Sequence, residues 1–291
     1  MDAEFTARHP VPASFSLDPE RPMGEELDRV LGAQIRAAHK ALKRLSRKRL
    51  QWADLALAAM ERIAAVAGLL AATDPDFAGT IQARLQPAIG RIDPWCQARV
   101  RRGLFDSLFC AQAYASQPVF AEVRALCRKY PADETDTAKP SPKAAAAAAL
   151  VDLEGLPFAA QAAGVMAGFS VADLRAGLSG SYAECRRRMR AASDVHPDTW
   201  ELARRQVEYH YQQLQLLEGL AGPERGEASD YRRCAELLTL DRGLAALHER
   251  LRTLVRVRNE VFYQPFIDVV ADRRQVLRLQ IESLDADLFG A

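Results

Sequence analysis

The chain of 291 residues lacks an excess of charge of either sign: 39 Lys and Arg residues are matched by 38 Asp and Glu residues, for a formal net charge of +1. No global electrostatic field therefore draws it to nucleic acid or membrane, and a polyanion site has to come from local clustering of basic side chains. Low-complexity composition is also missing, since 49% of residues are hydrophobic and 26% are charged. These values exclude disordered and collagen-like classes and predict a globular protein.

Cysteine pairs and long apolar runs are absent as well. The five cysteines form no CxxC pair and are odd in number, so we expect reduced thiols in a chain large enough to fold without disulfides. The most apolar stretch, Ala56 to Ala72, contains Glu61 and Arg62 and is shorter than the roughly 20 residues that a membrane span needs. The N-terminus has no basic segment followed by an apolar one. We therefore expect a cytoplasmic protein without a membrane span.

Runs of β-branched residues are nearly absent, and apolar residues recur every three or four positions rather than every second one. This is the period of the α-helix, so we predict an all-α fold. A polar segment with several prolines predicts a mobile N-terminal arm over 1–21, followed by a first helical half over 22–130. A segment with three prolines and then six alanines predicts a linker over 131–149, which leaves a second helical half over 150–291.

Two short patterns predict where helices begin. Asp74-Pro75, Asp93-Pro94 and Asp198-Thr199 each place a carboxylate acceptor directly before a helical segment. Ser170 with Asp173 resembles a capping box. We therefore expect one helix to begin just after each of these sites.

The most strongly basic element runs from Leu31 to Ala53 and has no acid between Arg29 and Asp54. At about 100° per residue, its basic side chains fall on one stripe and its apolar side chains on the opposite face. One interpretation is a contact for a polyanion, because cations one turn apart can each meet a phosphate and release its counterions. The other is a solvated face, or a surface on which the acidic N-terminal segment docks. The basic stripe consists of Arg36, Lys40, Lys43 and Arg47, and the apolar face of Ile35, Ala38, Leu42 and Leu45.

Two further segments predict packed helices. The segment Asp54 to Ala72 is apolar nearly all round, which is typical of a core helix. The segment Trp200 to Leu217 predicts a helix that packs by one face, with Arg204 and Glu208 turned away from it. His210 lies at the edge of the apolar arc, where it is either a ligand or base, or a core histidine whose hydrogen bonds are satisfied. The second interpretation is favoured, because no acid or second histidine stands at helical spacing from it.

Catalytic motifs are missing throughout. The five histidines are scattered, and the chain contains no HExxH, no Walker loop, no GxGxxG after a strand and no GxSxG. We therefore predict no enzymatic activity, no metal site and no cofactor.

Three stretches, Ser14 to Leu42, Gly177 to Leu220 and Ala271 to Ala291, together resemble the CHAD family. These α-helical domains are named for their histidines and bind inorganic polyphosphate. The resemblance implies two helical-bundle halves with a basic surface between them and no catalytic activity.

Part of the family's ligand set is matched in the second repeat. Arg186 matches the arginine that follows the repeat's tyrosine, and Arg204 and Arg205 match its Arg-Lys pair. Glu201 stands in place of the histidine and Glu208 in place of a lysine. A carboxylate beside a phosphate chain repels it, and each exchange changes the interaction by roughly 1 kcal/mol near a surface. The resemblance thus implies a degenerate member with weakened ligand positions.

Our prediction is a non-enzymatic, CHAD-like helical protein that binds a polyanion, with inorganic polyphosphate as the favoured ligand. The alternative is a protein-interaction or granule-surface scaffold that retains the fold but has lost polyphosphate binding. The candidate polyanion-binding residues are Arg36, His39, Lys40, Lys43, Arg44, Arg47, Arg62, Arg186, Arg204, Arg205, Arg274 and Arg278.

Overall fold

A computed structural model confirms the all-α prediction. The residues that it describes form helices and no strand, apart from an isolated bridge between Ser193 and His196. None of the described helices combines the length and apolar character that a membrane span requires. The structure describes residues 15–46, 51–109, 114, 116, 119–128, 141–156, 169–193, 196, 198–218, 220, 228–258 and 261–290.

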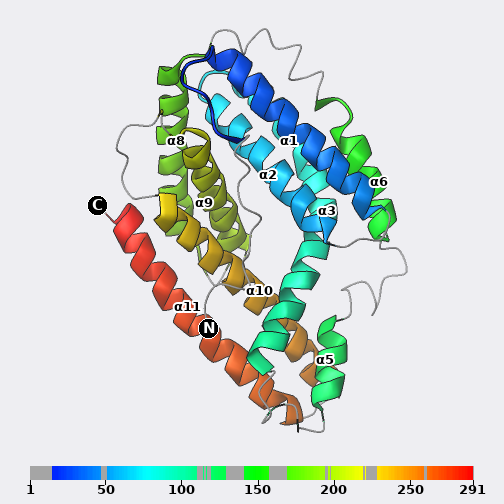
Figure 1. Ribbon diagram of the computed structural model, residues 1–291. Helices are drawn as coiled ribbons and strands as arrows, with labels where there is room; N and C mark the ends of the chain where they lie inside the picture. Colours follow the sequence, from blue (N-terminus) through cyan, green and yellow to red (C-terminus); the bar gives the residue numbers. More distant parts are fainter. Residues whose placement is uncertain are drawn as a thin grey trace. The chain divides into compact units, whose positions relative to one another are not determined.

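The helices are labelled in chain order in Figure 1. They are α1 (Met23–Leu45), α2 (Trp52–Leu70), α3 (Pro75–Phe109), α5 (Phe120–Arg128), α6 (Pro142–Leu153), α8 (Val171–Ala191), α9 (Asp198–Leu216), α10 (Ala228–Arg258), the 3₁₀ helix η4 (Val261–Tyr263) and α11 (Gln264–Phe289).

Three of the four predicted helix starts are confirmed: α3 begins directly after Asp74, α8 directly after Ser170 and α9 at Asp198. The start predicted at Asp93-Pro94 is wrong, because α3 continues through Pro94. The Phe77 backbone N–H donates to the Asp74 carboxylate at 2.9 Å, one turn into α3. At the start of α8, the Asp173 N–H donates to the Ser170 hydroxyl at 3.3 Å and the Ser170 N–H donates to the Asp173 carboxylate at 2.9 Å. This reciprocal pair is a capping box, which satisfies two backbone donors that a helix start leaves without partners.

The chain divides into two compact units. The larger unit takes its residues from 8–94 and 140–235, and the smaller unit takes residues from 95–139 and 236–291. The helices α3 and α10 each contribute residues to both units. The units therefore differ from the predicted halves, because each combines a segment from the first predicted half with one from the second.

In the larger unit, α2 is the central helix. It packs against α1, α8 and α9, and it is buried nearly all round, as its apolar sequence predicted. Gly177 lets α8 approach α2 closely, since a Cβ atom at this position would lie 2.1 Å from the carbonyl oxygen of Leu69. Figure 1 shows α1 beside α2, on the opposite side of it from α8.

The predicted linker is wrong where the structure describes it. Residues 142–149 form most of α6, whose first turn is capped by the Ser141 hydroxyl. Ala145, Ala146 and Ala149 are buried, and α6 packs against α1. Alanine has the highest helix propensity, and the preceding Ser-Pro supplies a cap and a first helical residue. Residues 131–140 lie outside the described residues.

The mobile arm predicted over 1–21 is wrong for its last seven residues, while 1–14 lie outside the described residues. Phe15 and Leu17 are buried, and the Leu17 N–H donates to the Leu216 carbonyl at the end of α9 at 3.0 Å. The segment Phe15–Pro22, which we call the strap, thus packs into the larger unit.

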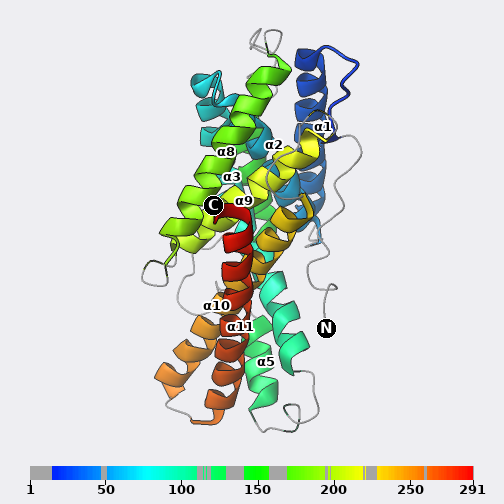
Figure 2. The same ribbon diagram turned by 90° about the vertical axis from the view of Figure 1, so that its left-hand side faces the viewer.

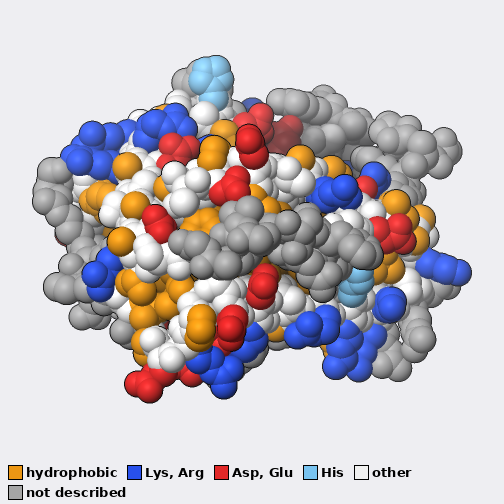
Figure 3. All heavy atoms as spheres, turned by 90° about the horizontal axis from the view of Figure 1, so that it is seen from above, with side chains coloured by type: hydrophobic (Ala, Val, Ile, Leu, Met, Phe, Trp, Pro, Cys, Tyr) orange, Lys and Arg blue, Asp and Glu red, His pale blue; other side chains and the backbone are white. Residues whose placement is uncertain are grey.

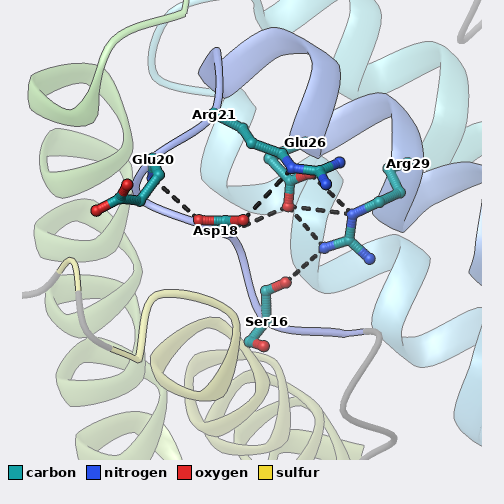
Figure 4. A network of polar contacts seen from close by, with 6 residues as sticks. All are labelled: Ser16, Asp18, Glu20, Arg21, Glu26 and Arg29. Carbon is teal, nitrogen blue, oxygen red and sulfur yellow. Dashed lines mark hydrogen bonds and ion pairs between the residues drawn. The ribbon is translucent and has the colours of Figure 1, made fainter.

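The strap is held to α1 by a charged network, which Figure 4 shows from close by. The buried Glu26 carboxylate accepts hydrogen bonds from the Arg29 guanidinium at 2.7 to 3.1 Å and from the Asp18 N–H at 3.0 Å. Arg29 also donates to the Ser16 carbonyl at 2.7 Å. The hydrogen bond from Arg29 is the main reason why the pKa of Glu26 is lowered.

In the smaller unit, aromatic rings form a cluster. The ring centre of Phe266 in α11 lies 4.9 Å from that of Phe109 and 6.4 Å from that of Phe105, both in α3. Phe105 lies 5.8 Å from Phe120 of α5. Such ring pairs stabilise a core beyond the burial of their area. In Figure 1, α11 runs beside the part of α10 that belongs to this unit, and in Figure 2 it crosses in front of α10; Arg274 of α11 and Asp241 of α10 form an ion pair there.

Candidate polyanion-binding site

The predicted basic stripe lies on the solvent side of α1. Arg36, Lys40 and Lys43 are exposed, whereas Ile35, Ala38, Leu42 and Leu45 are buried. The three cations are spaced by four and three residues and so lie one above the other on the helix surface. Within the described part of the chain, no acid forms an ion pair with any of them. We call these three side chains the α1 stripe.

Two neighbours of the α1 stripe are engaged by other side chains or by the backbone. The Arg44 guanidinium lies 4.2 Å from the centre of the Trp52 ring, a cation–π contact. The half-buried His39 ring hydrogen-bonds the Leu153 backbone at the end of α6. Burial, with Lys43 nearby, lowers the pKa of His39, so its imidazole is neutral at pH 7. Arg47 lies outside the described residues.

Arg204, expected on the outer face of α9, is instead buried, with 5% of its surface exposed. Its guanidinium donates to the Glu201 carboxylate at 2.9 and 3.1 Å, and Glu61 of α2 lies 3.7 Å away. Burial disfavours the charged form, but Glu201 and Glu61 together raise the pKa of Arg204. Arg205 donates to the same Glu201 carboxylate at 2.6 Å and to Gln86 at 3.2 Å. Arg204 and Arg205 match the Arg-Lys pair that the CHAD resemblance assigns to phosphate. In this chain they are instead paired with Glu201, and Arg204 also with Glu61.

The prediction that α9 packs by one face is wrong. Glu208 is buried, as Arg204 is, and its carboxylate accepts a hydrogen bond from Gln212 at 2.8 Å. Gln213 is buried too and donates to the Ala65 carbonyl at 2.8 Å. These buried polar groups are thus paired in part, by the α2 backbone for Gln213 and within α9 for Glu208 and Gln212.

Arg186 is half-buried on α8, in a turn where an acid already holds two neighbouring arginines. Glu184 accepts hydrogen bonds from Arg187 at 2.6 and 2.7 Å and from Arg188 at 2.6 Å. The hydrogen bond from Arg187 is the main cause that lowers the pKa of Glu184 to about 2.

Arg274 and Arg278 belong to the smaller unit and share one acid. The buried Asp241 carboxylate of α10 lies 3.1 Å from the Nε atom of Arg274 and 2.7 Å from a terminal nitrogen of Arg278. The predicted site residues are therefore divided between the two units, and Asp241 offsets one of the two positive charges of this pair.

Arg62 is buried within the larger unit, with 8% of its surface exposed. Its guanidinium carbon lies 5.7 Å from the centre of the Phe15 ring of the strap. Burial lowers the pKa of Arg62, against the attraction of Glu61 and Tyr211.

The core prediction for His210 is confirmed, but its hydrogen bonds are not satisfied. The ring is fully buried, packs edge-on against Tyr231 at 4.7 Å, and neither nitrogen has a hydrogen-bond partner among the described residues. Burial lowers the pKa of His210 to about 4. The ring is thus a neutral core side chain at physiological pH.

Basic side chains form small separate groups on the face seen in Figure 3, several of them beside Asp or Glu. Sequence reasoning missed two features of the candidate site: the strap, and the acids that form ion pairs with the arginines. Glu201 and Glu184 precede their arginines by three and four residues, a helical ion-pair spacing that does carry a signal. The packing of Glu61 against Arg204 has no such signal, because it joins residues far apart in sequence.

Comparison with family models, with curated proteins and with solved structures finds no match for this chain.

Proposed function

We propose that this chain is a non-enzymatic, CHAD-like helical protein that binds a polyanion along the α1 stripe, and that inorganic polyphosphate is its ligand. The observation that carries the proposal is the contrast between two groups of cations. Arg36, Lys40 and Lys43 are exposed and form no ion pair with the described acids, whereas Arg204 and Arg205 are held by Glu201. Only unpaired, solvated cations can exchange their counterions for phosphates without first breaking a contact.

The small size of the α1 stripe sets the expected strength of binding. Three cations on one helix face span about 10 Å, at a rise of about 1.5 Å per residue. For a flexible polyanion, each neutralised phosphate contributes about −0.7 to the slope of log K against log salt concentration. We therefore expect a slope near −2 and a loss of binding at high salt.

The test is a titration of long-chain polyphosphate into the full chain at two salt concentrations. The variant Arg36→Glu/Lys40→Glu/Lys43→Glu should abolish binding. A matched control, Arg84→Glu/Arg190→Glu/Arg233→Glu, reverses the same number of exposed cations elsewhere in the larger unit and so gives the same net charge. Equal losses in the two variants would contradict the proposal, because net charge rather than the α1 stripe would then decide binding.

A second candidate is a protein-interaction or granule-surface scaffold that has lost the ligand. The observation that favours this scaffold is the pairing of Arg204 with Glu201 and Glu61. This pairing removes one of the ligand positions that the CHAD resemblance implies. Absence of polyphosphate binding at low salt would support this candidate over the first.

A further inference from the structure

Arg62 is a buried cation without a hydrogen-bond acceptor. A guanidinium carries five N–H donors, yet no oxygen within the described residues accepts a hydrogen bond from it, and its Nε atom is shielded from solvent. Arg204, which is equally buried on the neighbouring helix, has two hydrogen bonds to Glu201 and a third contact to Glu61. Burial of a charge is unfavourable unless it is paired, so Arg62 lacks the compensation that Arg204 has.

The group that covers Arg62 comes from the strap. Phe15 is fully buried and presents its ring to the guanidinium at 5.7 Å. An aromatic ring attracts a cation but accepts none of its N–H groups in the way that an oxyanion does. The contact with Phe15 therefore supplies no hydrogen-bond acceptor for the Arg62 donors, and its Nε atom stays shielded from solvent.

The hydrogen bonds that hold the strap in place are made by residues other than Arg62. The strap backbone is held at three points: Ser16 by Arg29, Leu17 by Leu216, and Asp18 by Glu26. The first and third of these contacts depend on the one carboxylate–guanidinium pair of Glu26 and Arg29. These polar contacts, together with the buried side chains of Phe15 and Leu17, keep the strap in place beside Arg62.

We propose that the strap, Phe15–Pro22, is a displaceable cover over a latent oxyanion site centred on Arg62. Displacement of Phe15 opens the guanidinium to a phosphate group, which can accept two parallel N–H bonds from it. Strap closure and anion binding are mutually exclusive, so each weakens the other. This site is separate from the α1 stripe. Arg62 is one of the candidate polyanion-binding residues predicted from the sequence, and the new element is the strap that competes with its ligand.

The first test opens the site by mutation and uses inorganic tripolyphosphate as the probe. The apparent affinity for tripolyphosphate equals the intrinsic affinity multiplied by the fraction of molecules whose strap is open. Phe15→Ala increases that fraction, so it should raise the apparent affinity by about tenfold or more. Adding Arg62→Met should remove the whole gain, whereas adding the triple reversal of the α1 stripe should leave it. The gain can therefore persist even if the α1 stripe binds nothing, which separates the two proposals. A folded Phe15→Ala protein without the gain, or a gain that survives Arg62→Met, would overturn the inference.

A second test keeps Phe15, in case its removal prevents folding. Glu26→Gln removes the charge that holds Arg29 and the Asp18 N–H, and it should raise tripolyphosphate affinity in the same Arg62-dependent way. A further measurement uses the variant Arg36→Glu/Lys40→Glu/Lys43→Glu, in which the strap and Arg62 are unchanged. Saturating tripolyphosphate should lower the hydrogen-exchange protection of its Leu17 amide. Unchanged or increased protection of Leu17 under saturation would refute a displaceable strap.

Discussion

Glu201 holds Arg204 through two hydrogen bonds of 2.9 and 3.1 Å, and so fills the place that the CHAD resemblance reserves for a phosphate. The pair is intrahelical, three residues apart on α9, and it faces Glu61 across the interface with α2. A basic residue that matches a family pattern is therefore, in this fold, part of a closed internal network.

This pair predicts a large stability loss on removal of one charge. Glu201→Gln should lower the free energy of unfolding by about 3 kcal/mol, because it leaves the buried Arg204 without its main partner. The corresponding change at the more exposed Glu184, Glu184→Gln, should lower it by less than about 1 kcal/mol. Urea denaturation of both variants measures the difference, and equal losses would show that burial of Arg204 does not decide the energy.

The buried His210 predicts acid sensitivity above the range in which carboxylates titrate. Its pKa is about 4 in the folded chain against 6.5 in the unfolded one, so protons bind the unfolded state more tightly. The contribution of neutral His210 is complete above pH 6.5 and is lost progressively as the pH falls toward 4. Between pH 7.5 and 4.5 the loss is about 2 to 3 kcal/mol.

His210→Phe should remove this part of the pH dependence. The measurement is the free energy of unfolding of both proteins at pH 7.5 and 4.5, compared as a double difference. A variant whose stability falls as steeply as that of the original chain would show that His210 is not the group responsible.

The close approach of α8 to α2 predicts opposite effects for two alanine substitutions. Gly177→Ala places a Cβ atom 2.1 Å from the Leu69 carbonyl oxygen. Relief of this steric clash requires a shift of the helix backbone, so the substitution should lower the free energy of unfolding by about 1 to 3 kcal/mol. Gly180→Ala, one turn further along α8, meets no atom within 4 Å and should stabilise the chain by about 0.5 to 1 kcal/mol. Thermal unfolding distinguishes them, and a neutral Gly177→Ala would contradict the packing.

Cys185 should be unreactive in the folded chain. The thiol is buried beside Cys234, and desolvation, followed by the influence of Cys234, raises its pKa well above the ordinary value. Thiolate is the reactive form, so we expect alkylation by iodoacetamide at pH 8 only in denaturant. Peptide mapping by mass spectrometry identifies the residue, and rapid labelling of Cys185 in the native protein would disprove this arrangement.

Local patterns predicted the parts of the fold that depend on local contacts. The helical period gave the all-α class, Ser170 and Asp74 marked helix starts, and the opposite faces of α1 were assigned correctly. Each of these features depends on residues within one or two turns, where spacing in sequence fixes spacing in space.

Predictions that depended on distant partners were less successful. The sequence predicts a mobile arm where the strap lies, because the Leu17–Leu216 hydrogen bond joins residues some two hundred positions apart. The helical pattern predicts Arg204 on the outer face of α9, because nothing near it in sequence indicates that Glu61 of α2 offsets its charge. The alanine-rich segment predicts a linker, although its small side chains let α6 pack on α1.

Local residue patterns are enough to establish that this chain is helical, where several helices begin, and that α1 carries a row of cations opposite an apolar face. Which cations remain open to a ligand follows only from the packing of distant segments. Whether an arginine is open or closed depends on the acids, carbonyls and rings that other segments bring to it. Those partners come from helices and a strap that lie far apart along the chain.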